Sequence, residues 1–185
     1  MNILFVCTGN ICRSPVAELL MRDLVGEGLD VSSAGIAGLT GYAMDPRSVE
    51  YLRLRGVDGN DFTARRVSRR ILKKQDLIVG FEQEHVNECL ALEPAAISRT
   101  FRLCQLAAWQ RTGDLTSLAD LPALRRTLPA VDCELEDPVT FRSFDDYFRV
   151  LDVISADVAA LAELLPVEVW PCHAGSAHWP GDAAS

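Results

Sequence analysis

A short apolar strand that runs directly into a polar loop and a helix start constrains this chain more than any other feature. The stretch is ILFVCTGNICRSPVA, residues 3–17. Ile3–Val6 predicts a buried strand, and Ser14-Pro15 opens a helix, because proline is tolerated in the first helical turn. A helix N-terminus behind a tight loop can hold an anion. Since Cys7 stands at the end of the strand, we interpret the stretch as a phosphate-binding loop with a nucleophile.

The two reactive residues of this loop suit that chemistry. A thiol is a poor nucleophile until its thiolate is stabilised, which the helix N-terminus, Arg13 and the hydroxyl of Ser14 or Thr8 would do for Cys7. The planar guanidinium of Arg13 can hold two phosphate oxygens at once. Cys7 is therefore predicted as the nucleophile and Arg13 as the phosphate ligand.

The remaining loop residues would shape the backbone. Gly9 lets it approach the ligand, and Asn10 tolerates a left-handed conformation and can tie the loop together through its amide. Ser33, just before Ala34-Gly35, is a candidate support from the neighbouring strand. The predicted phosphate-binding loop comprises Thr8, Gly9, Asn10, Ile11, Cys12 and Ser14.

Short apolar strands alternate with helices over the first hundred residues. Strands are expected at residues 2–6, 29–33, 76–81 and 100–103, and helices at 14–26, 45–55, 64–74, 82–92 and 143–165. This alternation predicts an α/β domain with a parallel sheet. Ligands in such sheets bind beyond the carboxyl ends of the strands, and Cys7 stands at such an end. Leucine spacing predicts one or two further short helices between Cys104 and Val131.

Composition narrows the class of protein. The 185 residues carry a net charge of −8, which disfavours a nucleic-acid partner. The basic stretch 65–74 is interpreted as a solvated helix face, with steering of an anionic substrate as the alternative. No apolar run is long enough to span a bilayer and the start does not resemble a signal peptide, so we expect no membrane association and a cytoplasmic location.

The six cysteines and three histidines do not suggest a metal site. No CxxC pair occurs, and no histidine has the spacing to cysteine that a zinc site needs. In a cytosolic protein all six cysteines are expected to be reduced thiols. They are Cys7, Cys12, Cys89, Cys104, Cys133 and Cys172.

Expulsion of an alkoxide or phenoxide from phosphate requires a general acid. The candidate is Asp137, because Pro138 fixes its backbone and the long helix after Arg142 anchors its loop. Competing acids are Glu134, Glu136, Asp145 and Asp146, the last two being more typical of a helix start.

These motifs together resemble a known family. CTGNICRSP near the N-terminus, SSAG about twenty residues later and a late DP before a long helix are similar to the low-molecular-weight protein tyrosine phosphatases. The resemblance covers about residues 1–104 and 134–165. It implies a flavodoxin-like three-layer sandwich, with a four-stranded parallel sheet and helices on both faces, and no cofactor. It also implies that Cys7 is the nucleophile, Arg13 the phosphate ligand and Asp137 the acid and then the base, while Ser14 stabilises the thiolate.

The resemblance also bears on domain organisation and on a redox property. Residues 1–165 would form the phosphatase domain, with an inserted helical segment at about 105–131 that is longer than the family's usual connection. After Pro166 the composition turns to Pro, Gly, Ala, Ser and His, so residues 166–185 are expected to be a poorly ordered tail, in which Trp170 is a docking candidate. Cys12 matches a second loop cysteine that, in many members, forms a disulfide with the nucleophile and protects it from over-oxidation.

The expected walls of the substrate pocket depart from the family pattern. Members that act on phosphotyrosine usually carry aromatic residues after the DP, where this chain has Val139 and Thr140. Leu39 stands where another wall aromatic is common, with Tyr42 three residues on. The substrate is thus expected to be a phosphotyrosine protein, with a small phosphorylated metabolite as the alternative.

Other functions fit less well. A thiol-relay arsenate reductase shares the loop, but Cys89 has no closely spaced partner cysteine. A non-catalytic phospho-ligand binder would not need Cys7, Arg13 and Asp137 intact. A nucleotide-binding module would show GK[ST] after the loop or GxGxxG. The oligomeric state is left open.

Overall fold

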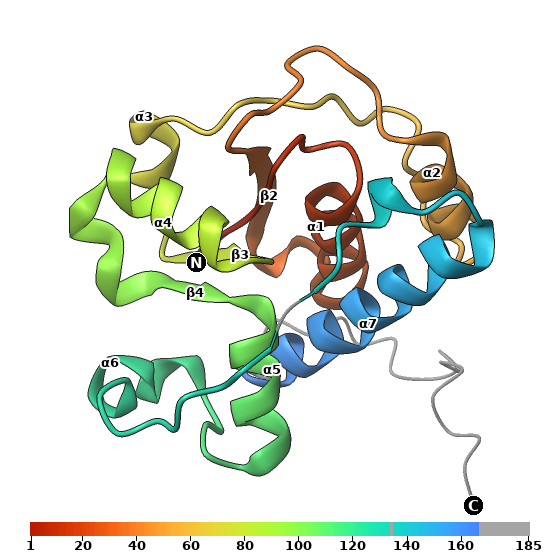
Figure 1. Ribbon diagram of the computed structural model, residues 1–185. Helices are drawn as coiled ribbons and strands as arrows, with labels where there is room; N and C mark the ends of the chain where they lie inside the picture. Colours follow the sequence, from red (N-terminus) through yellow and green to blue (C-terminus); the bar gives the residue numbers. More distant parts are fainter. Residues whose placement is uncertain (134, 167–185) are drawn as a thin grey trace, which may run out of the picture.

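One four-stranded parallel sheet organises the fold. The computed structural model describes residues 1–133 and 135–166 (Figure 1). The strands are β1 (Asn2–Cys7), β2 (Asp30–Gly35), β3 (Leu77–Gly80) and β4 (Thr100–Arg102). They pair in the order β2-β1-β3-β4, all parallel. The order reverses between β1 and β3, so the predicted flavodoxin-like topology is confirmed, with its ligand-binding edge at the ends of these two strands.

Helices cover both faces of the sheet, as Figure 1 shows. α1 (Arg13–Val25) and α7 (Phe144–Glu163) lie together on one face, and α4 (Gln83–Leu92) covers the other. Alternate side chains of β1 enter the two cores: Ile3 and Phe5 face α1 and α7, whereas Leu4 and Val6 face the other side. This alternation is the two-residue period of a strand buried on both faces.

The remaining helices are short. They are α2 (Pro46–Arg53), α3 (Arg69–Leu72), α5 (Leu103–Thr112) and α6 (Leu121–Leu124), with 3₁₀ turns at Gly26–Gly28, Pro94–Arg99, Leu118–Asp120 and Pro138–Thr140. The helix predicted at 64–74 is helical only over α3. The residues before it run extended beside the end of β2, where Gly35 bridges Arg66. The helices expected between residues 104 and 131 are α5 and α6.

Two arginines close the free edge of β2. Arg22 donates to the carbonyl of Val31 at 2.9 and 2.6 Å, and Arg65 donates to the carbonyl of Ser33 at 2.7 Å. Both carbonyls belong to alternate residues of the strand and so face the same side.

The cysteines differ from expectation. Cys7, Cys12 and Cys89 are free thiols, but Cys104 and Cys133 form a disulfide, with their Cα atoms 6.2 Å apart. The prediction of reduced thiols is therefore wrong for this pair. Twenty-nine positions separate the two residues, and only the return of the chain from α6 past the start of α5 brings them together.

Some expectations lie outside the described residues. They concern the predicted tail from residue 167 onward, which includes Trp170 and Cys172, and the competing acid Glu134. Within the described part of the chain, no helix combines the length and apolarity needed to cross a membrane. In the same part, no three potential metal ligands come together.

Candidate active site

The Cys7 thiol lies at the mouth of the loop between β1 and α1. Its side chain is buried, and its Sγ is 2.9 Å from the hydroxyl of Ser14. The backbone N–H of Asn10 also points at this sulfur, at 3.3 Å. Because α1 begins at Arg13, the sulfur also faces the positive end of a helix dipole. Hydroxyl, amide and helix start all favour negative charge at this position.

Asn10 holds the loop in shape. It is the non-glycine residue with positive φ, 58°, in the described chain, as its predicted tolerance of this conformation allows. Its amide donates to the hydroxyls of Ser14 and Ser33 at 2.9 and 2.8 Å, and its side-chain oxygen accepts from the N–H of Arg65 at 2.8 Å. The predicted support from Ser33 therefore acts through Asn10.

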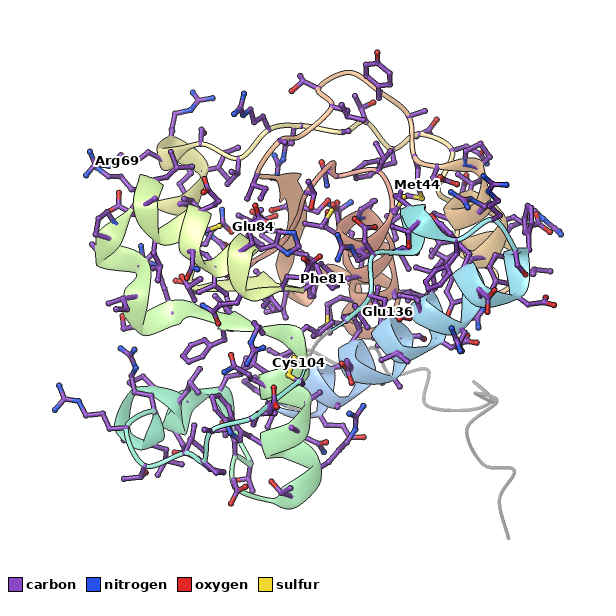
Figure 2. The ribbon with its side chains drawn as sticks, viewed as in Figure 1. Met44, Arg69, Phe81, Glu84, Cys104 and Glu136 are labelled. Atoms are coloured by element: carbon purple, nitrogen blue, oxygen red, sulfur yellow. A yellow bond between two sulfur atoms is a disulfide. The ribbon has the colours of Figure 1, made fainter. Side chains whose placement is uncertain are left out.

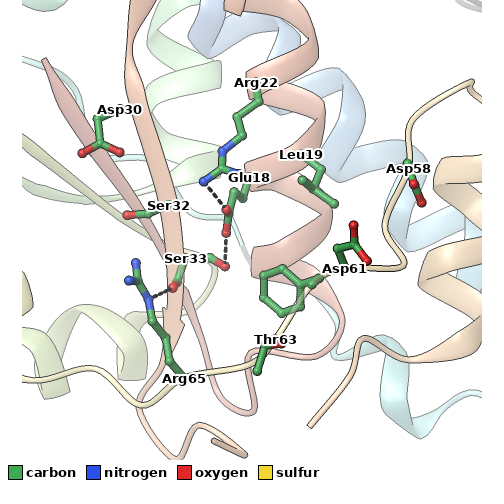
Figure 3. A pocket seen from close by; sticks show the side chains of 11 residues that line it. Glu18, Leu19, Arg22, Asp30, Ser32, Ser33, Asp58, Asp61, Thr63 and Arg65 are labelled. Carbon is green, nitrogen blue, oxygen red and sulfur yellow. Dashed lines mark hydrogen bonds and ion pairs between the residues drawn. The ribbon is translucent and has the colours of Figure 1, made fainter. Parts of the chain in front are cut away.

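The network continues to a buried carboxyl group. The Ser33 hydroxyl donates to Glu18 at 2.5 Å, and Glu18 also pairs with Arg22 at 2.7 Å (Figure 3). Burial raises the pKa of Glu18. Glu18 lines a pocket of about 530 Å³ beside the edge of β2. A hydrogen-bonded chain thus links this pocket through Ser33, Asn10 and Ser14 to the Cys7 thiol.

Gly35 lets the end of β2 touch the predicted phosphate-binding loop. A Cβ at this position would lie 2.4 Å from the carbonyl oxygen of Thr8 and 2.9 Å from the backbone nitrogen of Asn10. By contrast, a Cβ at Gly9 would meet its nearest atom, on Ile11, at 3.5 Å. The close approach is therefore required at Gly35, where the loop packs on the sheet.

Arg13 is buried, with 2 % of its side chain exposed, and contacts two carboxylates. One guanidinium nitrogen pairs with Glu82, directly after β3, and the other lies 2.9 Å from Asp137. The guanidinium also lies 6.0 Å from the ring centre of Phe81, which Figure 2 labels. Arg13 is thereby held at the carboxyl ends of β1 and β3, between Glu82 and Asp137.

Asp137 begins the 3₁₀ turn before α7. One carboxylate oxygen accepts from the N–H of Val139 at 3.1 Å, which leaves the other for Arg13. Of its described competitors, Asp145 and Asp146 occupy the first turn of α7, as expected of helix-start residues, and Glu136 lies 3.9 Å from Arg149. Among the described candidates for the acid, Asp137 is the one that contacts Arg13.

Cys12 is the loop residue directly before α1 and is buried. Burial raises the pKa of its thiol to about 12, although a hydrogen bond with Tyr147 opposes this. Asp45 also contacts this thiol and donates its backbone N–H to Ile11 at 2.8 Å. Cys12 is therefore a protonated thiol at neutral pH.

His85 reaches the loop from α4. Its Nδ1 accepts from the N–H groups of Phe81 and Glu82 at 3.2 and 3.0 Å, so its proton sits on Nε2, 3.1 Å from the Thr8 hydroxyl. Burial, and then the charge of Arg13, lower the pKa of His85 to about 4. A neutral imidazole of fixed tautomer thus braces the start of the loop.

The predicted pocket walls are open to solvent. Leu39 donates its backbone N–H to Gly9 at 3.0 Å, which places it beside the loop, and its side chain is 41 % exposed. Val139 is 53 % exposed next to Asp137, while the Thr140 hydroxyl turns back to the Asp137 carbonyl at 2.8 Å. Tyr42 is 64 % exposed and its backbone pairs with Ala64.

Comparison with known proteins identifies the family. The family model described as low molecular weight phosphotyrosine protein phosphatase matches residues 2–122. The chain belongs to this family. As a phosphatase of this family it is an enzyme that acts on phosphorylated substrates, and the matched residues include Cys7, Arg13, Glu82 and His85.

Individual relatives support the family assignment. The probable low molecular weight protein-tyrosine-phosphatase EpsP of Ralstonia nicotianae is 38 % identical over 105 residues, which cover 57 % of this chain and 72 % of that protein. Ptp of Acinetobacter johnsonii is 38 % identical over 102 residues, 55 % and 71 % of the two chains. The structure of the YwlE arginine phosphatase of Geobacillus stearothermophilus shares the fold, with a TM-score of 0.71, 23 % identity and coverage of 88 % and 90 %.

Three contacts of this phosphatase site were not predicted from its sequence: those of Glu18, Glu82 and His85. Glu82 and His85 read as ordinary helix-start residues, yet they follow β3, and side chains at the carboxyl end of a strand next to β1 belong near the loop. That position was the available signal for both. For Glu18, buried on α1, no comparable signal exists.

Proposed function

We propose that Cys7 is the nucleophile of a phosphatase that hydrolyses phosphate monoesters through a phosphocysteine, with protein phosphotyrosine as the substrate. The observation that carries the proposal is Arg13, which lies in the first turn after the Cys7 loop and contacts Asp137. A thiolate, a phosphate ligand and a carboxyl group thereby share one edge of the sheet.

The first step forms the phosphocysteine. The Cys7 thiolate attacks phosphorus in line, the bond to the leaving oxygen breaks, and Asp137 gives its proton to that oxygen. Arg13 and the N–H groups of the loop hold the equatorial oxygens, whose charge they stabilise through the transition state.

The second step releases phosphate. Asp137, now a carboxylate, takes a proton from water as the water oxygen attacks phosphorus. The S–P bond breaks and returns Cys7 as a thiolate. Ser14 and the Asn10 N–H, both within hydrogen-bonding distance of the sulfur, stabilise this leaving thiolate.

The walls favour a second candidate, a small phosphorylated metabolite. Leu39 and Val139 offer aliphatic, exposed side chains where a phenyl ring would gain from stacking on aromatic ones. Phosphotyrosine remains the first choice because the matching family is described by that substrate.

We also infer that Cys12 protects the nucleophile by forming a disulfide with it. Oxidation of Cys7 by peroxide gives a sulfenic acid, and attack by the Cys12 sulfur releases water and joins the two. Since the Cys12 thiol is buried and protonated, Cys7 is the sulfur that is oxidised first.

Hydrolysis of p-nitrophenyl phosphate tests the activity, and acid-quenched enzyme analysed by mass spectrometry tests for phosphate on Cys7. Turnover with loss in Cys7→Ser supports the proposal; activity retained by Cys7→Ser contradicts it. A panel of a phosphotyrosine peptide with sugar and nucleoside phosphates decides the substrate. Because an arginine phosphatase shares the fold, a phosphoarginine peptide completes the panel.

A further inference from the structure

The segment 129–133, which leads into Asp137, is held against β4 and α5 at three alternate residues. Trp109 donates its indole N–H to the carbonyl of Pro129 at 2.9 Å. Arg102, the last residue of β4, donates to the carbonyls of Val131 and Cys133 at 2.9 and 2.6 Å. These three carbonyls belong to alternate residues and accept from side chains of β4 and α5, so this side of the segment lies against those two elements.

A covalent bond adds to these contacts at the last of the three positions. Cys133 is bonded to Cys104, in the first turn of α5. Cys104 is labelled in Figure 2. Because α5 follows directly on β4, the disulfide joins the segment to the end of the sheet. Asp137 comes only four residues after Cys133, a span of at most about 14 Å of extended chain. The place where the segment is fastened therefore limits where the Asp137 carboxyl group can lie.

Apolar burial in this segment and directly after it is partial. Pro129, Ala130 and Asp132 are exposed, and Val131 and Leu135, which pack against the core, are only half-buried. A segment with little burial opens locally at low cost unless specific bonds hold it. The arginine and the disulfide are such bonds.

We propose that Arg102 and the Cys104–Cys133 disulfide position Asp137 for proton transfer, and that the disulfide makes this positioning respond to redox conditions. The inference rests on the proposed role of Asp137. Arg102, Cys104 and Cys133 act through Asp137 and are positioning residues.

The redox step is a thiol–disulfide exchange. A thiolate of an added dithiol attacks one sulfur of the pair and releases the other as a thiol; the second thiol of the reagent then closes a cyclic disulfide and frees the first cysteine. Oxidised glutathione reverses the step and is reduced to two molecules of glutathione. Both protein sulfurs belong to half-buried residues, which leaves a side open to such reagents.

The experiment compares the disulfide form, the dithiol-reduced form and the Cys104→Ser/Cys133→Ser double variant. Alkylation and peptide mapping establish the state of each cysteine, and rates are expressed per alkylatable Cys7. With phenyl phosphate, a poor leaving group, kcat should fall at least about fivefold on reduction, because a small misplacement of a catalytic group is costly. With p-nitrophenyl phosphate it should fall less. The double variant should have the kcat values of the reduced form, and added dithiol should not change them.

Arg102→Gln, with its disulfide intact, should show the same dependence on the leaving group as the reduced enzyme. Arg126→Gln, which changes an exposed arginine shortly before the segment, should not. Amide hydrogen exchange at residues 131–141 should quicken in the reduced form.

Equal rates and equal exchange in the disulfide and reduced forms overturn the proposal. Failure of the underlying function is separate: Asp137→Asn would then lose no more activity with phenyl phosphate than with p-nitrophenyl phosphate, whatever the state of the disulfide.

Discussion

The Asp137 carboxylate lies 2.9 Å from the guanidinium of Arg13, across 124 positions of sequence. Arg13 opens α1 and Asp137 precedes α7, so the packing of these two helices brings the pair together. The family match ends at residue 122, before Asp137, and this contact is therefore the main structural support for its role.

Asp137→Asn should separate substrates by leaving group. Loss of a general acid slows expulsion of phenoxide by about 10²–10⁴-fold, and p-nitrophenoxide, which needs less help, should suffer less. The measurement is kcat over a series of aryl phosphates. Asp145→Asn, in the first turn of α7, is the matched control. An equal loss for all substrates would remove Asp137 as the acid.

Glu82→Gln should tighten the binding of inorganic phosphate. The Glu82 carboxylate pairs with Arg13 and so competes with an anion for the same guanidinium. The inhibition constant for phosphate should fall about three- to tenfold. High salt should remove most of this difference, because it screens the interaction between the charges. Glu84→Gln, exposed on the same helix, should leave it unchanged. A weaker inhibition in Glu82→Gln would mean that Glu82 mainly orients Arg13.

His85 should make stability depend on pH. Its pKa falls from 6.5 to about 4 in the fold, so between these values the unfolded chain binds a proton that the folded one does not. The free energy of unfolding should therefore decrease as pH falls from 6.5 towards 4, by about 3 kcal/mol. Urea unfolding across this range should give a flatter profile for His85→Gln. Parallel profiles would contradict the assignment.

Gly35→Ala should displace the phosphate-binding loop. The added Cβ would lie 2.4 Å from the Thr8 carbonyl oxygen, and such overpacking costs about 1–3 kcal/mol of stability. Activity should fall with it. Gly9→Ala, whose Cβ would meet ordinary contacts, should cost less in thermal unfolding. Equal destabilisation by the two substitutions would show that the loop yields at Gly35.

Peroxide should inactivate the enzyme reversibly. A thiol reductant restores activity if Cys12 has captured the oxidised Cys7 as a disulfide. Cys12→Ser should recover much less after the same treatment, because Cys7 is then oxidised further. Cys89→Ser, a buried thiol whose pKa is also about 12, is the control and should recover as the parent does. Full recovery by Cys12→Ser would remove the protective role.

The sheet and the Cys7 loop could be predicted because their signals are local. The unbroken apolar run Ile3–Val6 is typical of a central parallel strand, and the loop residues are neighbours in the chain. Asp137 could be named as the candidate acid because Pro138 and a long predicted helix follow it in the sequence.

The rest depends on contacts between distant residues. The position of Glu82 and His85 after a strand was a signal, but the sequence does not establish that this strand, β3, lies beside β1, which is what brings them to Arg13 and Thr8. Likewise, the pairing of Cys104 with Cys133 follows from the return of the chain past β4. The basic stretch at 64–74 forms only a short helix because its first residues pair with Gly35 instead.

The two arginines on β2 have a consequence for association with other chains. A strand that added to this edge would have to hydrogen-bond to the carbonyls of Val31 and Ser33, which already accept from Arg22 and Arg65. It would also bring its backbone against two bulky cations. This edge of the sheet is thereby protected against the addition of another strand, a route to aggregation that open edges otherwise invite.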